Sequence, residues 1–130
     1  MKKGLVFLMM FGFLFCTQKP KELIGIWEVK SPHYRATYAI EEYNNRIVGK
    51  IQYYNDDTYV YKGTGTEKDI FLHKIKRKDS VYIDAISGAT MTKKDLVIKQ
   101  KSSDTLEVTT YIRNKPLKEF WIKKKKTHEN

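Results

Sequence analysis

The sequence predicts an all-β fold, an antiparallel up-and-down meander that closes into a small barrel of about eight strands. Three observations support this prediction. Beyond residue 22, apolar and polar residues alternate with the period of two that marks half-buried strands. Clusters of turn-forming residues separate the alternating runs, and no long stretch there has helical periodicity. A flat sheet of this length would expose its edges, so closure into a barrel is favoured.

The strands can be placed in chain order from these runs. The second is expected over residues 34–41, after a first strand that begins near Gly25. Its alternating side chains share one face: Tyr34, Ala36, Tyr38 and Ile40. Strict alternation in the third strand, over 47–54, places three side chains on one face: Ile47, Ile51 and Tyr53. The remaining strands are expected at 58–62, 70–76, 80–86, 95–100, 105–113 and 117–123.

Turn chemistry separates these strands. Asn tolerates a left-handed backbone, so Asn44 and Asn45 are expected to form a tight hairpin turn. Glycine, Asp, Ser and Pro mark the other breaks, at 55–57, 63–65, 78–79, 87–88, 102–104 and 114–116. Because the connections have hairpin length and no linker interrupts them, the sequence predicts one all-β domain over residues 23–124, followed by a basic tail over 125–130.

The N-terminal segment has the pattern of an export signal. Lys2 and Lys3 precede an apolar run over residues 5–15. As a helix this run would reach about 17 Å, whereas the hydrocarbon core of a bilayer is about 30 Å thick. The run is therefore too short to span a membrane unaided. Residues 1–15 are predicted to be a signal peptide, and the polar residues 16–22 a tether.

Cys16 directly follows the apolar run, and its position resembles the lipidation site of bacterial lipoproteins. The resemblance implies that Cys16 carries acyl chains and anchors the protein to a membrane of the cell envelope. Two or more acyl chains give stable anchoring, because each buried methylene contributes about 0.8 kcal/mol. Phe13 and Phe15 stand where such signals usually have Leu and a small residue. Plain secretion or a soluble periplasmic protein is the alternative, followed by an uncleaved N-terminal anchor.

Composition excludes several function classes. The 130 residues are 41% hydrophobic, which is too apolar for a disordered chain. A single cysteine excludes an internal disulfide. The three histidines, at 33, 73 and 128, lack metal-ligand spacing, so no metal site is expected. No nucleophile motif is present, so we expect no catalytic residues and a protein that is not an enzyme.

The formal net charge of +10 indicates an anionic partner. Basic residues cluster at 74–78, 93–94 and 115–126. An export signal argues against a nucleic-acid partner, and a tethered domain lies beside a membrane, where each lysine near an anionic surface contributes about 1 kcal/mol. The sequence therefore predicts a membrane partner and no nucleic acid.

Four short motifs resemble a family of small exported bacterial proteins of unknown function that are thought to fold as lipocalin-like barrels. The motifs are G-x-W at 25–27, G-K-[IV] at 49–51, a D-x-x-x-G turn at 84–88 and W-x-[RK] at 121–123. They span nearly the whole expected domain. The resemblance implies a lipocalin-like barrel, but the family has no established activity to carry over. Because such a barrel can hold one small ligand, we expect a protein without a cofactor that binds a small apolar ligand or a protein partner. Aromatic residues, among them nine Tyr, could line such a site.

A second, local resemblance overlaps the third motif. Residues 84–92 match D-x-x-[ST]-G-A-[TS]-x-[TS], which is similar to the attachment motif of proteins with covalently bound FMN. The resemblance implies that Thr92 takes the flavin phosphate and that Asp84 is needed by the attaching enzyme. In flavin-carrier domains the motif leads into a helix, whereas here an alternating strand follows. An extracytoplasmic flavin carrier is the alternative function.

Overall fold

The structure, a computed structural model, describes residues 19–85, 96–112 and 115–125. Within them the all-β prediction is confirmed. A short 3-10 helix, η1 (Lys21–Leu23), precedes the sheet, and a second, η2 (Glu67–Asp69), interrupts it. The strands are β1 (Gly25–Lys30), β2 (Arg35–Tyr43), β3 (Arg46–Asn55), β4 (Val60–Lys62), β5 (Ile70–Leu72), β6 (Ile75–Lys78), β7 (Val81–Asp84), β8 (Val97–Ser102), β9 (Thr105–Ile112) and β10 (Lys115–Lys123).

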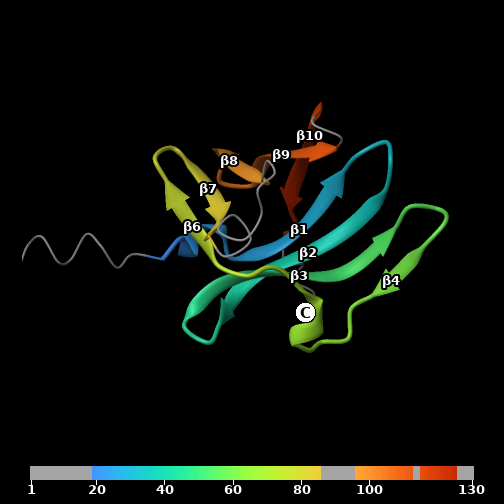
Figure 1. Ribbon diagram of the computed structural model, residues 1–130, viewed down its shortest axis with the longest axis horizontal. Helices are drawn as coiled ribbons and strands as arrows, with labels where there is room; N and C mark the ends of the chain where they lie inside the picture. Colours follow the sequence, from blue (N-terminus) through green and yellow to red (C-terminus); the bar gives the residue numbers. More distant parts are fainter. Residues whose placement is uncertain (1–18, 86–95, 113–114, 126–130) are drawn as a thin grey trace, which may run out of the picture.

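The strands form one antiparallel sheet in the order β4-β3-β2-β1-β10-β9-β8-β7-β6. This order is an up-and-down meander in which β10 pairs with its predecessor β9 and also with β1, so that the first and last strands of the sheet in chain order are neighbours. Figure 1 shows the sheet curled on itself like part of a barrel. The predicted meander and barrel-like curvature are thus present. The resemblance to lipocalin-like proteins stays a prediction.

The predicted strand over 70–76 is split, which raises the strand count to ten. Its first half, β5, pairs with β3, and its second half, β6, pairs with β7. The bend between them, at His73 and Lys74, is called the seam below. The Asp84 carboxylate accepts both backbone N–H groups of the seam, at 2.9 and 3.0 Å. The seam joins β5, which pairs with β3, to β6, which pairs with β7, and so links the two ends of the curled sheet covalently.

The concave face of the sheet holds the hydrophobic core. Its largest fully buried side chains are Trp27, Trp121, Leu23, Ile40, Ile47, Ile98, Leu106 and Val108. Most of them occupy alternate positions on their strands, as period-two burial requires. At the end of the barrel where β1 starts, η1 lies beside the hairpin turns of β2–β3, β6–β7 and β8–β9. We call this the basal end; η1 and two of these hairpins lie on the left of Figure 1.

The basal end is closed by packing. The indole N–H of Trp27 donates to the carbonyl of Leu23 at 2.9 Å, and both side chains are fully buried. The ammonium of Lys123 lies 5.5 Å from the centre of the Trp27 ring. A Cβ added at Gly25 would lie 2.5 Å from Lys123 Cε, and the φ of Gly25 is +156°. Both facts explain a glycine two residues before the tryptophan.

The opposite end, called the mouth, is formed by the β1–β2 connection over 31–34 and the β3–β4 connection over 56–59. Both lie on the right of Figure 1. The N-terminal side of the described chain lies at the basal end, where Pro20 is buried and Lys19 binds Glu42 at 2.7 Å. In the described part of the chain no helix has the length and apolarity to cross a membrane. The predicted signal over 1–15, Cys16 and the tail residues 126–130 lie outside that part.

Candidate functional site

A β-bulge in β3 determines which aromatic residues of this strand point into the barrel near the mouth. The β2–β3 register places Tyr38 opposite Ile51 but Thr37 opposite Tyr53, so Gln52 is the extra residue. Beyond the bulge the alternation is shifted by one, and Tyr54 packs against the core. The prediction that Tyr53 shares a face with Ile47 and Ile51 is therefore wrong. A one-residue bulge exchanges the two faces of a strand.

An aromatic cluster runs from the core to the mouth. The Tyr38 ring centre lies 4.8 Å from that of Trp121 and 4.6 Å from that of Phe71. Nearer the mouth, Tyr54 lies 5.2 Å from Tyr34 and 6.4 Å from Tyr59. The rings are tilted or edge-on, the arrangements that aromatic pairs prefer. The inner surface near the mouth is thus both apolar and dense in tyrosine hydroxyls.

Glu119 places a carboxylate inside this cluster. Its residue is 4% exposed, and its Oε1 accepts hydrogen bonds from the Tyr34 hydroxyl and, at 3.1 Å, from the Trp121 indole N–H. Burial, together with the nearby carboxylate, raises the pKa of Tyr34 far above its ordinary value and that of Tyr38 to about 12. Both phenols are therefore neutral donors at physiological pH.

A pocket of about 390 Å³ lies beside this cluster, between β3, β4 and β5. Three tyrosines and two isoleucines supply its apolar wall, and one lysine and one aspartate supply its charged groups: Tyr54, Tyr59, Tyr61, Ile51, Ile70, Lys68 and Asp69. We call it the mouth pocket. Its rim residue Tyr59 is 57% exposed, and the adjacent Val60 is 51% exposed. The volume suits a small organic ligand.

Asp69 holds the loop that bounds the mouth pocket. Its carboxylate accepts the backbone N–H groups of Thr64 and Gly65, at 2.9 and 2.8 Å, and the Tyr61 hydroxyl at 2.7 Å. These hydrogen bonds, the Thr64 N–H first among them, hold the pKa of Asp69 far below its usual range. The Tyr61 ring is thereby fixed against the pocket, and the carboxylate is already satisfied.

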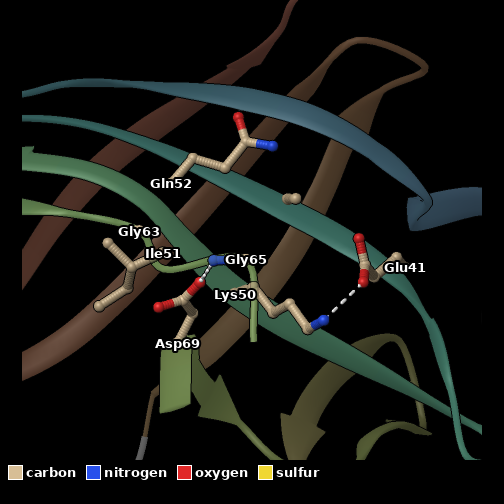
Figure 2. A pocket seen from close by; sticks show the side chains of 8 residues that line it. Glu41, Lys50, Ile51, Gln52, Gly63, Gly65 and Asp69 are labelled. Carbon is tan, nitrogen blue, oxygen red and sulfur yellow. Dashed lines mark hydrogen bonds and ion pairs between the residues drawn. The ribbon is translucent and has the colours of Figure 1, made fainter. Parts of the chain in front are cut away.

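A second pocket, of about 300 Å³, lies on the outer face of β2 and β3. Figure 2 shows that its charged groups are engaged. Lys50 pairs with Glu41 across the two strands at 2.9 Å, and Asp69 is turned toward Gly65. A ligand there would have to break these interactions. The mouth pocket, whose wall is mainly aromatic, is the better binding site.

The two residues predicted to carry covalent groups, Cys16 and Thr92, lie outside the described residues. The described end of the flavin motif is Asp84, which is 2% exposed and holds the seam. Recognition by an attaching enzyme would require this carboxylate to leave that position. Among the described residues, no three His, Cys, Asp or Glu side chains are grouped to bind a metal ion.

Sequence reasoning missed Glu119 and the mouth pocket, although both left signals. Four of the nine tyrosines stand between residues 53 and 61. Glu119 occupies an inner position of an alternating strand, two residues before Trp121. A charged residue on the apolar face of a strand marks a buried polar site.

Comparison with known proteins finds no family model that matches this chain, and no similar curated protein or solved structure. The class is therefore defined by the fold and the pocket alone: an antiparallel, barrel-like β protein with a tyrosine-lined pocket at its mouth.

Proposed function

We propose that this protein is a non-enzymatic protein of the cell envelope, anchored by acyl chains on Cys16, that binds a small apolar ligand in the mouth pocket. The observation that carries the proposal is the aromatic wall of that pocket, formed by Tyr54, Tyr59 and Tyr61. Apolar pockets with few polar groups are the usual form of small-molecule sites.

The acidic groups at the pocket are already engaged, which argues against a cationic ligand and leaves the exposed Lys68 as the remaining charged group of the wall. Asp69 is saturated by donors of its own loop, and Glu119 lies deeper, bonded to Tyr34 and Trp121. Tyrosine side chains offer ring faces and hydroxyls together. A flat, mostly apolar molecule with one hydrogen-bonding group fits this wall best.

Fluorescence titration with the neutral probe N-phenyl-1-naphthylamine tests the binding proposal. We expect enhanced probe fluorescence with the unmodified protein, and binding weakened by at least about tenfold in Tyr59→Ala, because its exposed ring forms the rim. Tyr53→Ala is the matched control, since Tyr53 lies on the outer face of β3, next to the pocket residue Tyr54. Equal binding by both variants would exclude the mouth pocket.

The anchor and the alternative function are tested by one measurement, the intact mass of protein purified from native envelopes. Acyl chains on the fragment that begins at Cys16 support the lipoprotein proposal, and Cys16→Ser should lose them. In the alternative, FMN is attached at Thr92 and gives a fluorescent band that survives denaturing electrophoresis and disappears in Thr92→Ala. A colourless protein from a host that has the attaching enzyme would end the flavin proposal.

A further inference from the structure

The basic residues of the chain are unevenly distributed between the two ends of the barrel. At the basal end, η1 and the neighbouring hairpin residues hold ten basic and four acidic residues, a net charge of +6, in the segments 19–22, 42–46, 76–80, 101–104 and 123–125. At the mouth, the described segments 30–35 and 55–59 hold two basic and two acidic residues, and Lys115 at the start of β10 adds one more basic residue. Among the described residues, the excess of positive charge is therefore larger at the basal end.

The basal charges are accessible and only partly neutralised. Arg77 and Lys19 form ion pairs with Glu22 and Glu42. Lys76 and Lys78 flank Arg77 on β6, are exposed, and form no ion pair with any residue that the structure describes. Lysines that are exposed and unpaired are free to contact anionic groups.

The N-terminal segment leaves the barrel at this same end. Lys19 is fixed there by its contacts with Glu42 and with Asn45, at 2.5 Å. Cys16 precedes Lys19 by only three residues, and the apolar run over 5–15 directly precedes Cys16. Whatever attaches that segment to a membrane brings the basal lysines to the same surface.

We propose that the basal end docks on an anionic lipid surface, with the mouth pocket turned away from the membrane. The proposal rests on the anchoring proposed above and adds the orientation and the lipid class. A basal end closed by Trp27 and Leu23 can face the bilayer without obstructing the pocket. Each lysine near an anionic surface strengthens binding by about fivefold.

Co-sedimentation of the full chain with vesicles tests this proposal. The vesicles contain phosphatidylcholine alone or phosphatidylcholine with phosphatidylglycerol. The test variant is Lys76→Glu/Lys78→Glu at the basal end, and the matched control is Lys30→Glu/Arg35→Glu at the mouth, which changes the net charge equally. Binding to the anionic vesicles should fall by about 25-fold or more in the basal variant and by less than about threefold in the control.

The two proposals fail differently. Loss of binding to phosphatidylcholine alone in Cys16→Ser, relative to the unmodified chain, reports the acyl anchor and not the basal charges. Equal effects of the basal and control variants would overturn the docking proposal, as would an affinity for anionic vesicles that is insensitive to salt. If the basal end binds an acidic protein instead, binding to vesicles should not depend on their phosphatidylglycerol content, which would also overturn the proposal.

The orientation has a readout of its own. In the Cys16→Ser chain, a fluorophore is attached through Ser80→Cys at the basal end or Thr58→Cys at the mouth; both positions are exposed. Lipids with a quencher on the headgroup should quench the fluorophore at position 80 and leave the one at position 58 bright. Equal quenching at both positions would contradict the orientation.

Discussion

The two ends of the barrel are built from the same kind of strands, yet they differ in packing and in charge. At the basal end Trp27 and Leu23 are fully buried and the surrounding surface is basic. At the mouth Tyr59 is mostly exposed, and the described segments carry a smaller excess of positive charge. This difference suggests that the two ends have different roles: the closed basal end stabilises the fold, and the open mouth provides the pocket. Four changes test this division.

Trp27→Ala should have the largest effect. The indole is fully buried, lies under Lys123 and donates to Leu23, so its removal leaves a cavity and an unpaired carbonyl. We expect the free energy of unfolding to fall by about 3–5 kcal/mol. Tyr59→Ala at the mouth should cost less than about 1 kcal/mol. Urea denaturation of both variants gives the comparison, and equal losses would show that the mouth carries stability too.

Tyr34→Phe should have the next largest effect, because it leaves the buried Glu119 carboxylate with one donor fewer. Loss of a hydrogen bond to a buried charged group costs about 1–3 kcal/mol. Tyr43→Phe is the control, since its hydroxyl bonds Glu67 at the surface. Thermal unfolding checks the pair of variants. A control as destabilised as the test variant would mean that Glu119 needs no interior donor.

Gly25→Ala should destabilise the basal end by about 1 kcal/mol, because alanine disfavours the positive φ and its Cβ meets Lys123. The double variant with Lys123→Ala relieves the contact and retains only the backbone cost. If the melting temperature of the double variant is higher than that of Gly25→Ala, the contact with Lys123 contributes to the loss. If the two melting temperatures are equal, the whole loss comes from the backbone conformation of residue 25.

Acid should produce the smallest effect, at the mouth. Hydrogen bonds from Thr58 lower the pKa of Asp56 from 3.8 to about 2. A carboxyl whose pKa is lower in the folded state stabilises the fold above its unfolded value. This contribution is complete above about pH 4 and is lost as the pH falls through 2. Denaturation midpoints between pH 5 and pH 2 should fall less in Asp56→Asn, which keeps the acceptor oxygen and cannot titrate.

Much of the fold follows from alternation in the sequence, and the exceptions have physical causes. The turn at Asn44 and Asn45 was readable because both residues tolerate the positive φ that they adopt. The bulge at Gln52 was not, since a register shift depends on the partner strand. The split of the predicted strand at the seam was not predictable either. The backbone N–H groups of the seam donate to Asp84, which lies on another strand, ten residues beyond Lys74.

The candidate site was less predictable than the strands. The density of tyrosines between residues 53 and 61 is visible in the sequence, but which of them face inward depends on the bulge. From its sequence context Asp69 would be expected on the surface. In the structure it is buried, and backbone N–H groups of the preceding loop donate hydrogen bonds to its carboxylate. Alternation along one strand carries no information about such loop contacts.

The central position of β10 has a consequence for the order in which this protein can fold. β10 follows the other strands in the chain, pairs with both β1 and β9, and carries Trp121 and Glu119. Until β10 is made, β1 has β2 as a neighbour but lacks its second one, and Trp27 lacks the cover of Lys123. The pairing of Trp27 with Lys123 spans most of the chain, a separation that slows closure. The barrel therefore cannot close without β10, and a variant truncated before Lys115 should leave β1 and β9 each with an unpaired edge.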